Sequence, residues 1–210
     1  MSIEEKERRE RIIKKARELF GQHGYSKVTM EEIANSLGIS KKTLYHFFAN
    51  KQEVLREMME DQQCEFMDHI ESIWKSNDLD FIGKVRTILD YVGARSSEIN
   101  HLQEIQKVEP EIWDEMHDYK RGKAFERVRN ILEAGFETGI FRYDVDRNVL
   151  LLLYMHAVEA IINPETLSDL PLTGSQAFEA ISRIIFEGIL TDEGRKKYLS
   201  YSQEPSKAAK

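Results

Sequence analysis

Apolar residues recur every three or four positions along most of this chain, which is the spacing of one face of an α-helix. No segment shows a convincing alternation of apolar and polar residues, the pattern of a half-buried strand. Four prolines and eleven glycines interrupt the 210 residues. The pattern therefore predicts an all-α protein.

The first 52 residues are expected to form three helices. An apolar stripe predicts the first over about 3–23, ended by a glycine. Thr29 and Glu32 have the spacing of a capping box, which predicts a short second helix that ends at Gly38. Ser40 is expected to cap a third helix that runs to about residue 48.

Longer helices are expected beyond residue 50. Lys51 opens one that reaches about residue 74, and others are predicted near 78–97, 101–120, 121–138, 145–163 and 175–190. The expected breaks lie at 76–78, Glu109-Pro110, Gly139 and 163–174. Ser175 is the expected cap of the last of these, and Asp192 the start of a short terminal helix. Residues 201–210 are expected to form a flexible polar tail.

The predicted third helix has two distinct faces. On a wheel of 100° per residue, Phe47 and Phe48 lie within about 60° of Leu44 and form an apolar face. The opposite side carries polar and basic residues, namely Lys42, Thr43, Tyr45 and His46. Two short helices joined by a tight glycine turn, the second with such an outer face, are suited to the major groove of DNA. An exposed face of this kind is also common in helical proteins that bind no DNA.

Charge is unevenly divided along the chain. Residues 1–52 hold eleven Lys/Arg against seven Asp/Glu, a formal charge of +4, and the remainder holds nineteen against thirty, which is −11. Because the first 52 residues are basic and the rest are acidic, only the N-terminal segment is expected to be attracted to an anionic polymer.

The sequence is typical of an intracellular protein. The single Cys64 excludes an intramolecular disulfide and a thiolate metal cluster. The first residues have no apolar core of a signal peptide. The longest apolar run, 149–155, is far shorter than the roughly 20 residues that cross a bilayer. A cytoplasmic location with no membrane partner is therefore expected.

The N-terminal segment resembles the DNA-binding domain of the TetR family of bacterial one-component transcription regulators. The resemblance covers about the first 55 residues and includes the exit of the first helix, Leu19-Phe20 to His23-Gly24-Tyr25. The family pattern is matched in register at Thr29, Ile33-Ala34, Gly38-Ile39-Ser40, Leu44-Tyr45, Phe47-Phe48 and Lys51. The resemblance implies a helix-turn-helix repressor that binds a pseudo-palindromic operator as a homodimer and is released by a small effector.

The resemblance also implies which residues contact double-stranded DNA. Thr29 is expected to cap its helix and contact a phosphate, Tyr45 to donate its hydroxyl to a phosphate, and Lys51 to bind the DNA backbone. The full expected set is Thr29, Ser40, Lys41, Lys42, Thr43, Tyr45, His46 and Lys51. Since phosphate contacts position a protein without specifying sequence, the operator is not predicted.

The expected domains are a helix-turn-helix domain over 1–52 and a helical effector-binding and dimerisation domain over 53–200. Residues 149–162 are apolar nearly all the way round, so this helix needs cover on more than one side. A partner subunit supplies that cover if two helices of each chain pack as a four-helix bundle; otherwise both helices fill a monomer core. The expected dimer residues are Leu152, Phe178, Ile181, Ile185 and Ile189.

An effector cavity is expected to be mostly apolar with few polar groups. His156 and Glu159 share one helical face and are able to pair with each other, contact the dimer partner or contact a ligand. The candidate ligand residues are Trp113, Met116, Tyr119, Phe125, Met155, His156 and Glu159, with Phe136 as a further aromatic, and the expected ligand is lipophilic. The same residues would also suit an ordinary core.

Two other function classes are compatible with parts of the sequence. Glu98 and His101 have the spacing of a di-iron ligand pair, but a metal-dependent helical-bundle enzyme needs two such motifs and two further carboxylates. A helical protein-binding adaptor would use the apolar helices alone and have no affinity for DNA. We therefore expect no enzyme activity, no cofactor and no metal.

Overall fold

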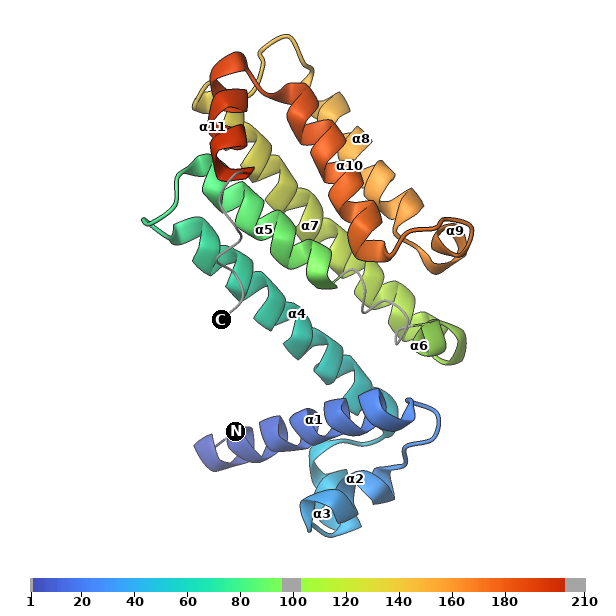
Figure 1. Cartoon of the computed structure of the whole chain (residues 1–210). Helices are drawn as coiled ribbons and strands as arrows, with labels where there is room; N and C mark the ends of the chain where they lie inside the picture. The colour runs from blue at the N-terminus through green and yellow to red at the C-terminus, as the bar shows by residue number, and fades with distance from the viewer. Residues whose placement is uncertain (1, 96–102, 203–210) are drawn as a thin grey trace. The chain divides into compact units, whose positions relative to one another are not determined.

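The computed structural model describes residues 2–95 and 103–202, and within them the chain is almost entirely helical (Figure 1). One isolated bridge, between Phe141 and Leu190, is the sole β-type pairing in these residues. The helices are α1 Ile3–His23, α2 Met30–Leu37, α3 Lys41–Phe47, α4 Lys51–Lys75, α5 Phe81–Arg95, α6 Gln103–Val108, α7 Pro110–Glu137, α8 Arg147–Ile161, α9 Pro164–Ser168, α10 Gly174–Ile189 and α11 Asp192–Ser202. The all-α prediction is confirmed.

The helix boundaries differ from the sequence prediction in the middle of the chain. The predicted break at Glu109-Pro110 is confirmed, but the predicted separation of helices 101–120 and 121–138 is wrong, because α7 continues through residue 120 for 28 residues. Pro110 begins α7, where its missing N–H and fixed φ are tolerated. Gly122 then lies inside the helix, because no proline or capping residue accompanies it to end the helical hydrogen bonds.

Two details near the C-terminus also differ. The cap of α10 is Thr173 and not Ser175, because Thr173 and Gln176 form a capping box in which each side chain bonds the other's backbone N–H, at 3.2 and 2.9 Å. The short helix α9, capped by Asn163, was not predicted. Asp192 does begin α11. The tail was expected from residue 201, but α11 extends to Ser202, and residues 203–210 lie outside the described residues.

The chain forms two compact units, and the boundary between them falls within α4 and α7. The described parts of 1–68 and 101–120 make one, here called the head unit, and those of 69–100 and 121–210 make the other, the body unit. The division into domains 1–52 and 53–200 stays a prediction, because compactness does not test which segment folds alone.

Each unit has its own apolar core. The head core joins α1–α3 and the start of α4 to Ile105, Ile112 and Met116 from α6 and α7. In the body core the ring of Phe141, fully buried, lies 5.5, 5.7 and 5.3 Å from those of Phe81, Phe136 and Phe186.

No helix in the described part of the chain is long and apolar enough to cross a bilayer.

Candidate nucleic-acid interface

The two short helices of the head unit, α2 and α3, are joined by a tight turn. Thr29 caps α2: its hydroxyl accepts the N–H of Glu32 at 3.2 Å, and the Glu32 carboxylate accepts the Thr29 N–H at 2.7 Å. Gly38 has φ +67°, the left-handed conformation that glycine adopts without steric cost. Ser40 caps α3 by accepting the N–H of Thr43 at 3.0 Å. These local signals are the ones that the sequence predicted.

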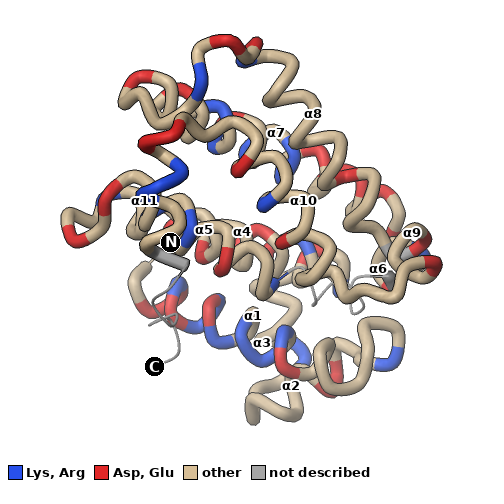
Figure 2. The backbone as a smooth tube through the Cα atoms, turned by 45° about the horizontal axis from the view of Figure 1, so that its top comes forward, with Lys and Arg blue, Asp and Glu red and all other residues tan. Residues whose placement is uncertain are grey.

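The third helix has a buried face and an exposed one. Leu44 and Phe48 are fully buried and Phe47 is partly buried, as the helical wheel predicts. Tyr45 is 51% exposed. Ser40, Lys41, Lys42 and His46 are also exposed, and Thr43 is partly buried. Figure 2 shows basic residues at α3, and both signs of charge along α1. The exposed face of α3 therefore presents cationic and hydrogen-bonding groups next to the positive end of the helix dipole.

The two lysines at the start of α3 differ in their surroundings. Lys41 forms an ion pair of 2.6 Å with Glu31 of α2, so part of its charge is neutralised within the chain. Lys42 forms no ion pair among the described contacts. The electrostatic attraction of the α3 face for an anion therefore depends more on Lys42 than on Lys41.

Lys51 is held inside the head unit. Its ammonium donates to the carbonyls of Tyr25 and Val28, both at 2.9 Å, and lies 4.1 Å from the centre of the Tyr25 ring. Partial burial lowers the pKa of Lys51, although Glu109, Glu104 and Glu32 oppose that shift. Two of its three donors are used by the α1–α2 connection. Its expected contact with the DNA backbone stays a prediction.

Tyr25 also contacts two carboxylates, one from α6 and one from the residue between α6 and α7. Glu104 accepts the backbone N–H groups of Tyr25 and Ser26, each at 2.9 Å, and Glu109 accepts the Tyr25 hydroxyl at 2.8 Å. Burial, and then the bond to Glu109, raises the pKa of Tyr25. These contacts could not be predicted from the sequence, because the partners lie about 80 residues apart and no local pattern links them.

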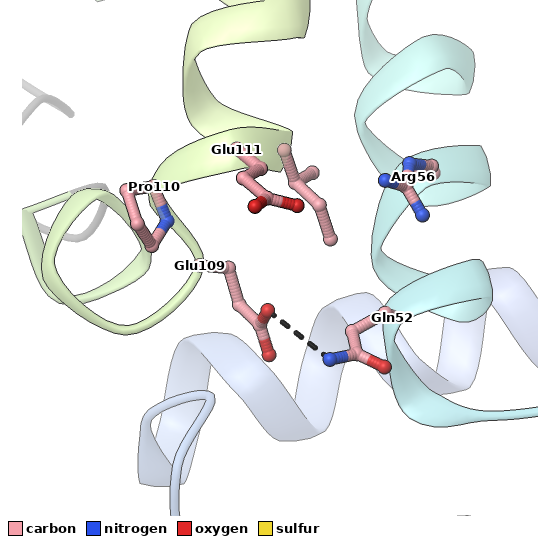
Figure 3. A pocket seen from close by; sticks show the side chains of 6 residues that line it. Gln52, Arg56, Glu109, Pro110 and Glu111 are labelled. Atoms are coloured by element: carbon pink, nitrogen blue, oxygen red, sulfur yellow. Dashed lines mark hydrogen bonds between the residues drawn. The ribbon is translucent and has the colours of Figure 1, made fainter.

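A groove of about 340 Å³ lies beside Glu109 in the head unit. It is lined by Gln52 and Arg56 of α4 and by Glu109, Pro110, Glu111 and Ile112 (Figure 3). Gln52 donates to Glu109 at 3.3 Å across it. The groove is polar and borders the same contacts that hold Tyr25.

Replacing Glu104 with glutamine is expected to make the chain less sensitive to acid. Hydrogen bonds from the side chain and backbone of Ser26, and then from the backbone of Tyr25, favour the charged carboxylate and lower the pKa of Glu104 below its ordinary 4.5. Because this pKa is lower in the folded chain than in the unfolded chain, the charged carboxylate stabilises the fold at pH values above the unfolded-state pKa. That stabilisation is lost as the pH falls through the folded-state pKa. At pH 7 the variant should be about 1 kcal/mol less stable, after discounting for solvent exposure. Urea unfolding at pH 7 and pH 3 measures the difference, which should shrink at pH 3; a difference that is the same at both pH values contradicts this role.

The candidate ligand residues fall into both units. Trp113 and Met116 pack on the head core, and Tyr119, also in the head unit, is 52% exposed. Phe125 and Met155 pack partly buried against the body core. In the body unit, Glu159 lies 3.5 Å from His156 Nδ1 and 3.6 Å from a guanidinium nitrogen of Arg121. His156 and Glu159 therefore lie within ion-pairing distance of each other in the single chain. Their contact with a ligand or with the dimer partner stays a prediction.

The candidate dimer residues differ in burial. Phe178, Ile181 and Ile189 of α10 are 3%, 8% and 6% exposed, because they pack inside their own unit. Ile185 is partly buried, and Leu152 of α8 is 45% exposed. Further exposed apolar residues, outside the expected dimer set, lie on the same two helices: Val149, Leu153 and Ile184, at 63%, 57% and 72%.

The metal hypothesis gains no support from the residues that the structure describes. They contain no group of three or more His, Cys, Asp or Glu side chains placed to hold an ion. The Glu98–His101 pair lies outside the described residues.

Comparisons with known proteins find similarity to bacterial transcription regulators. Residues 12–58 match the sequence profile described as "Bacterial regulatory proteins, tetR family". The HTH-type transcriptional regulator YvaF of Bacillus subtilis is 23% identical over 87% of this chain and 96% of its own length. The matched profile spans α2, the glycine turn and α3.

Two solved structures have the same fold. A transcriptional regulator from Cytophaga hutchinsonii superimposes with a TM-score of 0.69 at 21% identity, covering 86% of this chain and 97% of that one. SmeT, the repressor of the Stenotrophomonas maltophilia multidrug efflux pump SmeDEF, gives 0.67 at 20% identity, covering 88% and 91%. SmeT is also known as a complex with triclosan.

Proposed function

Because the chain belongs to the TetR family of bacterial regulatory proteins, we propose that it is a transcriptional repressor that binds a pseudo-palindromic operator as a homodimer. The observation that carries this proposal is that α3 exposes Lys42, Tyr45 and His46 on one face. Its other face packs on the head core through the fully buried Leu44 and Phe48. Such a protein acts on the chromosome, and hence in the bacterial cytoplasm.

The direct test is a selection from random duplex DNA with the purified chain. We expect an enriched inverted repeat, since a two-fold symmetric dimer presents two copies of α3 to two half-sites. Affinity for the selected duplex should fall steeply with salt, because phosphate neutralisation releases counterions. A helical adaptor that binds protein alone would enrich no sequence, and that result would refute the proposal.

Replacing Tyr45 with phenylalanine is expected to lower the affinity for DNA by about fivefold, as the loss of one hydrogen bond predicts. Because we assign the hydroxyl to a phosphate, the selected duplex and a scrambled duplex should lose affinity by the same factor. Fluorescence anisotropy with both duplexes measures this. Tyr143→Phe, which alters a 72% exposed tyrosine of the body unit, is the matched control and should change neither affinity. A loss confined to the selected duplex would instead assign Tyr45 to base recognition.

We assign the dimer surface to α8 and α10. Val149, Leu152 and Leu153 are exposed at helical spacing on α8, and Ile184 is exposed on α10, which packs beside it. An apolar stripe of this kind on a single chain fits a second copy of the same helices. This assignment replaces Phe178, Ile181 and Ile189 as the contact residues, because their side chains are used inside the unit.

We further propose that a lipophilic effector binds in the body unit. Phe125 and Met155 offer partly buried apolar surface, and the His156–Glu159–Arg121 group offers polar contacts. The effector must prefer one conformation of the dimer in order to release DNA, since equal affinity for two states shifts nothing. A compound panel that includes triclosan, the ligand of SmeT, tests this. An effector should raise the melting temperature and weaken binding to the selected duplex, and Met155→Glu should remove both effects.

A further inference from the structure

Arg9 of α1 is bound at once to the end of α3 and to α4. One of its terminal nitrogens donates to the carbonyl of Phe47 at 2.7 Å, and its Nε donates to the Glu57 carboxylate at 2.7 Å. Its other terminal nitrogen forms an ion pair with Glu57 and lies 3.7 Å from Glu53. The guanidinium carbon lies 4.3 Å from the centre of the Phe48 ring. All of these residues belong to the head unit.

The end of α3 needs such a contact. The helix has seven residues, which is too few for stability by local hydrogen bonding alone. Its first turn is fixed by the Ser40 cap, and its middle by the buried Leu44. The carbonyls of the last turn have no partner within the helix, and Arg9 satisfies that of Phe47.

The partners of Arg9 are themselves fixed to the start of α4. Glu53 accepts the N–H of Ala49 at 2.6 Å, and its own N–H donates to Asn50 at 2.8 Å. The turn between α3 and α4, the carboxylates of α4 and the guanidinium of α1 thus form one connected group. A planar guanidinium holds several donors in one fixed plane, so it can bind a carboxylate and a carbonyl at once while its flat face stacks on a ring.

We infer that Arg9 is a positioning residue for DNA recognition: it sets the orientation of the last turn of α3, which carries Tyr45 and His46, and does not itself touch DNA. This inference rests on the proposed function. The side chain of Arg9 is 24% exposed and its donors are engaged. Its neighbour Arg8 is 55% exposed and pairs with Glu4 of the same helix at 2.6 Å.

The test compares Arg9→Met with Arg8→Met, which removes the same charge one residue away. We expect Arg9→Met to reduce the ratio of affinities for the selected and scrambled duplexes by about tenfold, as expected when a charged hydrogen-bond donor is lost. Arg8→Met should leave the ratio unchanged. The slope of log affinity against log salt concentration should be the same in both variants. The loss of a phosphate contact would reduce the size of that slope by about 1, and Arg9 is inferred to make no such contact.

A second pair of variants covers the case in which Arg9→Met fails to fold. Glu57→Gln keeps Arg9 but removes its anchor, and Glu60→Gln makes the same charge change at an exposed position of α4. Removing one acidic charge strengthens the attraction of the head unit to any DNA. This effect is the same for the selected and the scrambled duplex, so it cancels in the ratio of the two affinities. We expect Glu57→Gln to lower the ratio about fivefold and Glu60→Gln to leave it unchanged. An unchanged ratio in Glu57→Gln, or a slope reduced in Arg9→Met, overturns the inference.

Hydrogen exchange without DNA separates this inference from the proposed function. Amides of residues 44–48 should exchange at least about fivefold faster in Glu57→Gln than in Glu60→Gln, because the end of α3 is less firmly held. If the native chain selects no duplex, the proposed function fails, and the exchange result still reports whether Arg9 and Glu57 fix α3. Equal exchange in the two variants rejects the positioning role.

Discussion

Replacing Leu153 with glutamate is expected to leave the chain monomeric and to lower its affinity for the selected duplex by about 100-fold or more. The Leu153 side chain is 57% exposed in the single chain, and it lies on α8 beside the exposed Val149 and Leu152. In a dimer through this surface a carboxylate would be buried without a partner, which costs several kcal/mol. A monomer binds one half-site at a time. It therefore lacks the increase in affinity that a dimer obtains when its second subunit is already held close to the second half-site.

Analytical ultracentrifugation and anisotropy on the same samples measure the two effects. Leu199→Glu is the control, since Leu199 is 53% exposed on α11 and lies outside the proposed surface. It should remain dimeric and bind with native affinity. A Leu153→Glu protein that stays dimeric would move the interface elsewhere on the body unit, and a monomer with native affinity would contradict two-fold recognition.

The parts of the fold that the sequence predicted well are those determined by neighbours in the chain. The Thr29–Glu32 box, the left-handed Gly38 and the Ser40 cap each act within four residues, so their sequence spacing defines their geometry. The buried face of α3 follows from the helical period in the same way. The exposure of Lys42, Tyr45 and His46 follows from this period, and their contact with DNA stays a prediction.

The parts that the sequence did not predict depend on contacts between distant residues. The Glu104 and Glu109 contacts with Tyr25, and the contacts of Arg9 with α3 and α4, join segments 38 to 84 residues apart. A helical wheel also identifies an apolar face without saying which molecule covers it. Phe178 and Ile184 are both apolar and lie on α10, yet the first is buried in its own unit and the second is 72% exposed.

Alanine substitutions at two glycines of α7 are expected to change stability in opposite directions. A Cβ at Gly135 would lie 2.1 Å from a ring carbon of Phe141, whereas one at Gly122 would meet nothing within 4 Å. The Gly135 carbonyl accepts the N–H groups of Ile140 and Phe141, at 3.0 and 3.1 Å, which draws that ring against the helix. Phe141 has three aromatic neighbours and no exposed surface, so it has no room to move.

Gly135→Ala should therefore lose about 3 kcal/mol through overpacking, which corresponds to a melting temperature lower by about 6–12 °C. Gly122→Ala should gain about 0.5–1 kcal/mol, because alanine loses less backbone entropy in a helix interior. The two variants add the same methyl group to the same helix, so the difference between them isolates the contact with Phe141. Thermal unfolding at one fixed protein concentration measures both, because association also adds to apparent stability. Equal shifts would mean that the Phe141 ring is displaced at little cost, and restoring the stability of Gly135→Ala with Phe141→Leu would identify the ring as the source of the strain.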